Sequence, residues 1–246
     1  MIGQQFFMME AGLEHGKKTK VSVVVPAWNE EDTIMATLEA VRRLASDDPY
    51  FDYELIVVDD CSSDQTFILA IPWVDLLVKH TQNQGKAAAL TTGWKRARGE
   101  YIVFLDADVG CSAFHLSGLL QPIHEDMADI AVARVPVRRS SRFSFAANLA
   151  REGVFQLSGF RSTAMISGPI AVKATVMNSI GRLEDGYGTG VALMIDSIRR
   201  GYRVAEMDLP FSSKERMRNW NGIPHMGRQM YDVGKTLWSR WRNPVS

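Results

Sequence analysis

Short apolar runs rich in β-branched residues recur between residues 21 and 135, and segments with helical periodicity separate them. The runs are VSVVVP from Val21, ELIVVDD from Glu54, DLLVK from Asp75, YIVFLDAD from Tyr101 and DIAVARV from Asp129. Nearly continuous apolar strands are typical of a parallel sheet that is covered on both faces. The sequence therefore predicts an α/β fold: a doubly wound, mostly parallel sheet with helices on both faces.

Helical patterns fill the intervals between these runs. The first helix is expected after Asn29, the predicted N-cap, because Ile34, Leu38, Val41 and Leu44 are spaced to share one helix face. Further helices are expected at 86–96, 113–125, 192–200 and 226–241.

Composition narrows the function. The 246 residues hold 28 Lys and Arg against 28 Asp and Glu, so no global charge favours nucleic acid or an anionic membrane. Two cysteines cannot form a disulfide framework, which suits a cytoplasmic protein. No stretch approaches the roughly 18 apolar residues of a membrane span, so a membrane-associated form would be peripheral, at the inner face.

Polar residues follow three of the predicted strands, where ligands collect in a doubly wound sheet. Asp106 and Asp108 are two apart, so a continuing strand would present both carboxylates on one face, with Ala107 pointing away. Two carboxylates can share a hard divalent cation, Mg²⁺ or Mn²⁺, that also takes phosphate oxygens. The alternative is a solvated strand-to-loop turn.

Two other segments could contribute to the same site. Asp60 ends a strand and is assigned to hydrogen bonding with a base or ribose, whereas Asp64 is assigned mostly to helix capping. Gly85 and Lys86 open a helix, where a cation conflicts with the helix dipole and an anionic diphosphate would relieve the conflict. A solvent-exposed lysine is the alternative.

The second half offers one candidate catalytic group. Glu184 and Asp185 lie between helical patterns, and Asp185 could act as general base toward an acceptor hydroxyl. A turn with two solvated carboxylates explains the same pattern.

Three ordered motifs carry a family resemblance. VSVVVPAWNEE, ELIVVDDCSSDQT and NQGKAAALTTGWKRARGEYIVFLDAD together resemble the N-terminal half of family 2 glycosyltransferases, which have the GT-A fold. The resemblance implies that Pro26, Ala27, Asn29 and Glu30 line the nucleotide pocket. It also implies that Asp60 reads the base, usually uracil, and that Asp106 and Asp108 hold the ribose and the metal-diphosphate. Capping remains the alternative for Asn29 and Glu30.

The stretch from Gly168 to Phe211 resembles glucosyl-3-phosphoglycerate synthases and, less closely, dolichyl-phosphate mannose synthases. Two departures stand out: Gly190 replaces an acidic residue, and residues 214–216 replace a metal-binding histidine. Glu215, or His225 from a shifted loop, could supply the third metal ligand instead.

These observations lead to one hypothesis and several rivals. We expect sugar transfer from a nucleoside-diphosphate sugar, a UDP-sugar above all, to a small molecule or lipid phosphate, with Lys86 and Asp185 as catalytic residues. The expected organisation is a loose segment at 1–20, a nucleotide-sugar-binding half at 21–110, an acceptor-side half at 111–212, and a C-terminal loop and helix at 213–246. A homodimer is compatible with this organisation.

The rivals are a sugar nucleotidyltransferase, a catalytically silent scaffold and a dehydrogenase. The nucleotidyltransferase would need a glycine-rich loop after the first strand, and the dehydrogenase would need G-x-G-x-x-G there; neither is present. The basic cluster at 134–142 gives only a weak case for nucleic acid; it could meet anionic lipid or an acidic acceptor, and exposure to water is the default assignment. The end from Trp238 to Arg242 could anchor the protein at a membrane interface, but packing of its tryptophans is the preferred interpretation.

Overall fold

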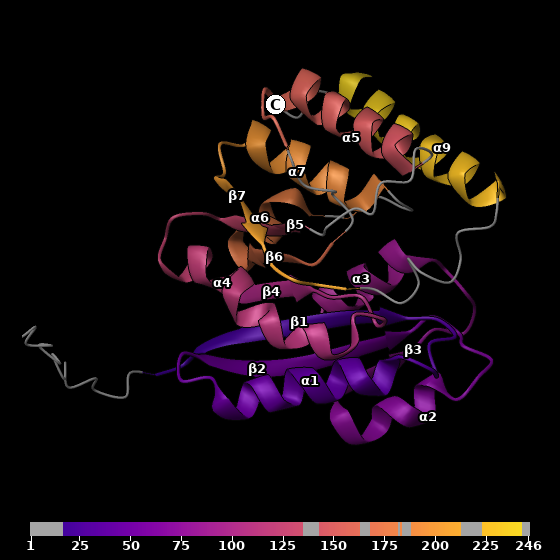
Figure 1. The fold of residues 1–246 in the computed structure, drawn as a ribbon, viewed down its shortest axis with the longest axis vertical. Coiled ribbons are helices and arrows are strands. Elements are labelled where there is room, and N and C mark those ends of the chain that lie inside the picture. The colour runs from indigo at the N-terminus through magenta and orange to yellow at the C-terminus, as the bar shows by residue number, and fades with distance from the viewer. Residues whose placement is uncertain are drawn as a thin grey trace, which may run out of the picture.

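A computed structural model describes residues 17–134, 143–162, 168–181, 183, 188–212 and 223–242. In this part of the chain, one seven-stranded sheet has the order β3-β2-β1-β4-β6-β5-β7 (Figure 1). The strands are β1 (Thr19–Ala27), β2 (Phe51–Asp59), β3 (Leu76–Lys79), β4 (Tyr101–Phe104), β5 (Ile130–Arg134), β6 (Ile170–Lys173) and β7 (Val204–Asp208). Only β6 runs antiparallel to its neighbours β4 and β5, so the predicted mostly parallel sheet is confirmed.

Helices cover both faces, as predicted. One face carries α1 (Ile34–Asp47), α2 (Thr66–Ala70) with the 3₁₀ turn η1 (Ile71–Trp73), and α4 (Leu116–His124), which continues the 3₁₀ helix η2 (Gly110–His115). The other face carries α3 (Lys86–Trp94), α5 (Phe143–Ser158), α6 (Ala174–Ile180), α7 (Thr189–Arg199) and α9 (Ile223–Arg242). Figure 1 shows α1 and α2 on one side of the sheet and α5, α7 and α9 on the other.

The continuous apolar runs are explained by this double cover. Val23 of β1 packs in the cluster under α1 and α4, whereas its neighbour Val24 packs in the cluster under α3 and α7. Both side chains are fully buried, so successive residues of the strand must all be apolar.

Close packing fixes α3 on the sheet. A Cβ atom added at Gly93 would lie 2.4 Å from Cγ1 of Val24, so only glycine allows α3 to approach β1 this closely. This contact holds the last turn of α3 against the middle of β1.

Three details differ from the sequence-based expectation. The strands β6 and β7 were not predicted; β6 has four residues, and the half-buried β7 has two acidic residues among its five. β1 begins at Thr19, inside the segment expected to be loose. Asn29 is not the N-cap of α1, because a turn at Glu30 intervenes and the cap position is Thr33.

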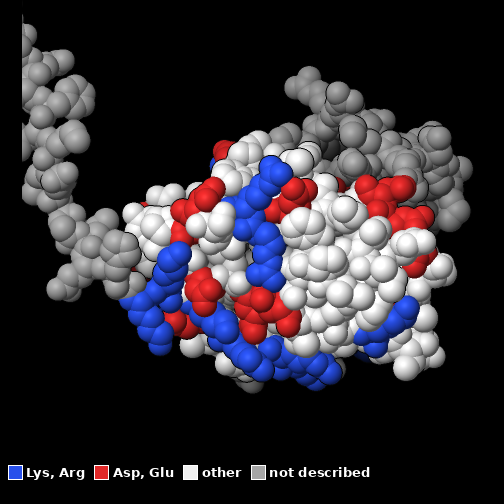
Figure 2. All heavy atoms as spheres, turned by 90° about the horizontal axis from the view of Figure 1, so that it is seen from below, with Lys and Arg blue, Asp and Glu red and all other residues white. Residues whose placement is uncertain are grey.

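A charge network joins the amino-terminal ends of β5 and β7 to β6. Lys173 contacts Asp126 and Asp129 at 2.7 and 2.8 Å, and Arg203 contacts the same two carboxylates. Although burial opposes it, hydrogen bonds from Arg203 and Lys173 hold the pKa of Asp129 well below its ordinary value. On the face shown in Figure 2, acidic and basic side chains likewise lie next to each other.

Within the described residues, no helix combines the length and the apolar character that crossing a bilayer requires.

Candidate functional site

The carboxyl ends of β1, β2 and β4 meet at one edge of the sheet. Ala27 pairs with Asp59 in the parallel register, and the backbone N–H of Asp60 donates to the carbonyl of Ala27 at 2.8 Å. The segment from Asp106 to Asp108 follows β4, the other neighbour of β1. Most of the sequence-predicted site residues therefore come to this edge.

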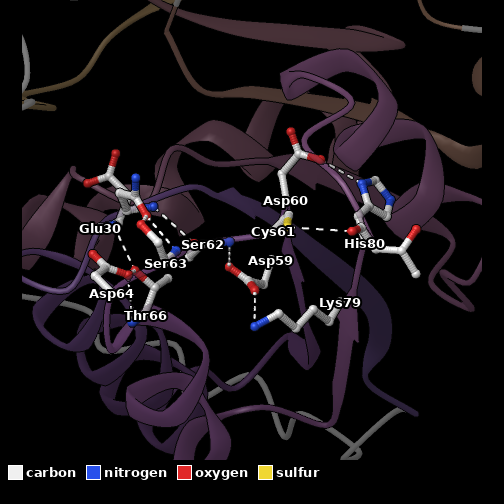
Figure 3. A network of polar contacts seen from close by, with 12 residues as sticks. Glu30, Asp59, Asp60, Cys61, Ser62, Ser63, Asp64, Thr66, Lys79 and His80 are labelled. Atoms are coloured by element: carbon white, nitrogen blue, oxygen red, sulfur yellow. Dashed lines mark hydrogen bonds and ion pairs between the residues drawn. The ribbon is translucent and has the colours of Figure 1, made fainter.

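The loops after β1 and β2 are joined by hydrogen bonds (Figure 3). Asn29 has a left-handed backbone with φ of 54°; its N–H donates to Oγ of Ser62 at 3.0 Å, and its Oδ1 accepts from the N–H of Ser63 at 2.9 Å. The N–H of Glu30 donates to Oγ1 of Thr66 at 2.7 Å, and the carboxylate of Glu30 accepts from Thr33. Asn29 and Glu30 thus hold this edge of the sheet together.

Asp64 completes this loop pair. Its Oδ1 accepts from the N–H and the hydroxyl of Thr66, the first residue of α2, although the N-cap position of this helix is Gln65 and not Asp64. Although burial opposes it, hydrogen bonds from Thr66 and from the N–H of Glu31 hold the pKa of Asp64 below its ordinary value.

Pro26 and Ala27, predicted to line the nucleotide pocket, are the last two residues of β1. Pro26 is half-buried, but the side chain of Ala27 is 3% exposed and belongs to the core under α1. Any contribution of Ala27 to a pocket must come through its main chain.

The carboxylate of Asp60 organises the loop that leads into α3. Its Oδ1 accepts from the N–H of Gln84 at 2.9 Å and lies 2.7 Å from Nδ1 of His80, while its Oδ2 accepts from the N–H of Gly85 at 2.7 Å. Gly85 has φ of 91°, a conformation that glycine adopts without strain, and it is the N-cap of α3. Asp60 therefore places a negative charge at the positive end of the α3 dipole.

Lys86, the first residue of α3, forms an ion pair with Asp106. The side chain of Lys86 is 52% exposed, so its ammonium group can reach other partners at the surface. Asp106 supplies the anion that we had expected a diphosphate to provide. The pair nevertheless shows that α3 and the segment after β4 face one another at this edge.

The strand argument for Asp106 and Asp108 was wrong in its geometry. β4 ends at Phe104, and both aspartates lie beyond it, with Asp108 in a turn, so strand alternation does not set their directions. The side chain of Asp106 is 27% exposed, whereas Asp108 is buried at 4%. Their carboxylates therefore differ in access to solvent.

A buried threonine of α1 holds this turn. Oγ1 of Thr37 donates to the carbonyl of Ala107 at 2.7 Å and accepts from the N–H of Gly110 at 2.8 Å. Thr37 and Ala107 are buried, so the carbonyl of Ala107 is satisfied away from water, whereas Gly110 is half-buried. The sequence reasoning missed Thr37 because it treated α1 only as cover for the sheet.

The chemistry of Asp106 and Asp108 fits a hard divalent cation, because carboxylate oxygens are the ligands that Mg²⁺ and Mn²⁺ prefer. Among the described residues, no group of three or more His, Cys, Asp or Glu side chains is placed to hold a metal ion. A cation at the pair would complete its coordination with water and phosphate oxygens, as Mg²⁺ commonly does.

Three predicted functional groups cannot be placed. Asp185 and Glu215 lie outside the described residues, and His225 lies in α9, where its side chain is likewise not described.

The tryptophans near the chain end do not pack as we had preferred. Trp238 and Trp241 are 56% and 64% exposed, and their ring centroids are 5.3 Å apart on the outer side of α9. The inner side of α9 is occupied by other residues, among them the buried Val233 and Thr236. The two rings therefore pack against each other at the surface and not against the body of the protein.

A doubly wound sheet with acidic residues and a helix N-terminus at one edge is the arrangement in which α/β proteins bind ligands beyond their strand ends. Comparison with protein families identifies the class more closely, because residues 22–179 match the model of glycosyl transferase family 2. The chain belongs to this family, as its motifs indicated.

Two curated relatives show the range of the family. The dolichyl-phosphate β-glucosyltransferase of Homo sapiens is 32% identical over 164 residues, which are 59% of this chain and 47% of that protein. A UDP-Glc:α-D-GlcNAc-diphosphoundecaprenol β-1,3-glucosyltransferase of Escherichia coli is 37% identical over 91 residues, or 36% of this chain and 34% of that protein. The chain thus spans less than half the length of both.

Solved structures give the wider match. The glucosyl-3-phosphoglycerate synthase of Mycobacterium tuberculosis, crystallised with Mn²⁺, UDP-glucose and phosphoglyceric acid, superimposes with a TM-score of 0.75 at 26% identity, covering 93% of this chain and 81% of that one. The same enzyme with Mg²⁺ and UDP has a TM-score of 0.75, covering 90% and 79%. These likenesses confirm the predicted GT-A-type fold and the expected resemblance of the second half.

Proposed function

We propose that this chain transfers a sugar from a UDP-sugar to an acceptor hydroxyl or phosphate and requires Mg²⁺ or Mn²⁺. The single observation that carries the proposal is that Asp60, Lys86 and Asp106 meet at one edge of the sheet. Lys86 forms an ion pair with Asp106, and Asp60 accepts a hydrogen bond from the N–H of Gly85 at the start of α3. The solved synthase has this fold and was crystallised with Mn²⁺ and UDP-glucose, which supports the same donor class here.

Each residue then has a task set by its position. Asp60 would accept a hydrogen bond from the base, and Lys86, freed from Asp106, would meet the diphosphate beside the positive end of α3. The two loops joined through Asn29 and Glu30 would form the wall next to the nucleotide. Because these contacts pre-exist, binding would need little rearrangement beyond the swing of one exposed lysine.

Asp106 and Asp108 would hold the divalent cation, which when bound neutralises charge on the leaving diphosphate, an effect worth several kcal/mol of barrier. Thr37 keeps the turn that carries them in place. We retain Glu215 and His225 as candidates for a further ligand.

Asp185 remains our candidate base for an acceptor hydroxyl. A phosphate acceptor would need no such base. The curated relatives act on lipid-linked acceptors by their names, whereas the synthase was crystallised with phosphoglyceric acid, and we propose one of these two acceptor classes.

We also propose that the outer face of α9 meets an anionic membrane surface. Tyr231, Trp238 and Trp241 are exposed along it, and the guanidinium of Arg242 lies 5.1 Å from the ring centroid of Trp238. Aromatic rings with neighbouring cations suit the headgroup region of an anionic bilayer.

A thermal-shift panel tests the donor proposal. UDP, GDP and CDP and their sugars are each added with and without Mn²⁺, and ligands that bind the native state raise the melting temperature. We expect stabilisation by the UDP series that depends on Mn²⁺. No shift with any nucleotide would refute the proposal and favour a silent scaffold.

A further inference from the structure

His80 is a buried side chain at the site that no part of the proposed reaction yet uses. It follows β3 and is 8% exposed, and its backbone N–H donates to the carbonyl of Asp59 at 2.9 Å. Its imidazole bridges two elements: Nδ1 lies 2.7 Å from Oδ1 of Asp60, and Nε2 lies 2.9 Å from Oγ1 of Thr92 on α3. Figure 3 shows the ring turned toward the Asp60 carboxylate.

The hydrogen-bond inventory fixes the role of each nitrogen. A carboxylate only accepts, so the hydrogen of the contact with Asp60 is on Nδ1 of His80. Nε2 then accepts from the Thr92 hydroxyl when the ring is neutral, or donates to it when the ring is charged. Thr92 therefore accommodates the ring in either state and holds its plane.

The same inventory shows which oxygen of Asp60 can serve a ligand. A carboxylate offers about four acceptor positions. Oδ1 takes two donors, from His80 and Gln84, and Oδ2 takes one, from Gly85. Oδ2 is thus the oxygen with the greater remaining capacity. The side chain of an aspartate rotates over a broad range of χ2 angles. The second hydrogen bond to Oδ1, from His80, restricts that range for Asp60.

We propose that His80 is a positioning residue for nucleobase selection: it fixes Asp60 so that Oδ2 accepts a hydrogen bond from N3–H of uracil. This inference rests on the proposed function and deepens it. Cytosine has a lone pair at N3, so an oriented carboxylate rejects it, whereas a carboxylate free to turn away discriminates less. The base selectivity of the site would therefore depend on a side chain that does not touch the base.

The test is isothermal titration of UDP and CDP, each with Mn²⁺, against the wild-type protein and four variants. His80→Leu removes the donor, His80→Asn keeps an N–H₂ group near the position of Nδ1, Thr92→Val releases the ring from its other side, and Asp60→Ala removes the carboxylate. A hydrogen bond to a charged group supports about a tenfold effect. We expect His80→Leu to lower the UDP to CDP affinity ratio about tenfold, Thr92→Val to lower it less, and His80→Asn to restore most of it.

A merely structural role would weaken UDP and CDP binding equally and lower the melting temperature, leaving the ratio unchanged; that result overturns the inference. If His80→Leu does not fold, an unchanged ratio in Thr92→Val overturns it as well. Failure of the proposed function looks different: the wild-type protein would not bind UDP, or Asp60→Ala would bind it normally. If Asp60→Ala loses UDP while the His80 and Thr92 variants keep the wild-type ratio, only the inference on His80 fails.

Discussion

Replacing Thr37 by valine should damage both the stability of the protein and its metal site. The two side chains have nearly the same shape, but valine can neither donate to the carbonyl of Ala107 nor accept from the N–H of Gly110, which are now bonded at 2.7 and 2.8 Å. A buried polar group without a partner costs about 1–3 kcal/mol. The carbonyl of the buried Ala107 is such a group and the N–H of the half-buried Gly110 is one in part, which gives an expected loss of roughly 1–4 kcal/mol of unfolding free energy.

Urea unfolding measures this loss, and titration of UDP with Mn²⁺ measures the effect on the turn that carries Asp108. Thr37→Ser is the matched control, since it keeps the hydroxyl and removes only a methyl group. We expect the serine variant to keep wild-type UDP affinity and the valine variant to lose about tenfold of it. A valine variant that loses less than about 1 kcal/mol and binds UDP normally would refute this account of the turn.

Further predictions concern the base, pH and the membrane. Asp185→Asn should cut turnover at least about a hundredfold while UDP binding persists, as measured by steady-state kinetics and titration; unchanged transfer would exclude it as base. Because the pKa of Asp129 is lowered in the folded state, its stabilisation is present above the unfolded value near 3.9 and is lost as pH falls through the folded value. The unfolding free energy of Asp129→Asn, measured as a function of pH, should thus fall less steeply in acid than that of the wild type; equal slopes would contradict this. Finally, Trp238→Ala and Trp241→Ala should reduce sedimentation with anionic vesicles, whereas Ile68→Ala, at another exposed apolar position, should not; a wild-type protein that ignores vesicles would end that proposal.

The central strands of the sheet could be predicted because each is marked by a pattern within its own few residues. β1, β2 and β4 are buried on both faces, so each appears as a continuous apolar run ending in polar residues. β7 lacks this signal, since all of its residues are at least partly exposed and two of them are acidic. β6 is as short as β3 and β4, but α6 begins directly after it at Ala174, so no turn residue separates its apolar residues from those of the helix.

The sequence was enough to select the acidic residues of the candidate site, but not the residues that hold them in place. Residue type and position after a strand were enough to select Asp60 and Asp106, and a cation at the start of a helix was enough to select Lys86. The bonds of Asp60 to His80 and of Thr37 to Ala107 join positions 20 and 70 residues apart, and no spacing rule relates them. The direction of Asp108 was missed because β4 ends earlier than its apolar run suggests.

The most direct test of the central claim compares UDP titrations of the wild-type protein, Asp108→Asn and Asp52→Asn, each with and without Mn²⁺. Asp52 is an exposed carboxylate at the opposite end of β2, so its variant controls for the loss of one charge. We predict Mn²⁺-dependent UDP binding in the wild type and in Asp52→Asn, and weak binding without Mn²⁺ dependence in a folded Asp108→Asn protein. Wild-type affinity and Mn²⁺ dependence in Asp108→Asn would contradict the claim that this turn holds the cation.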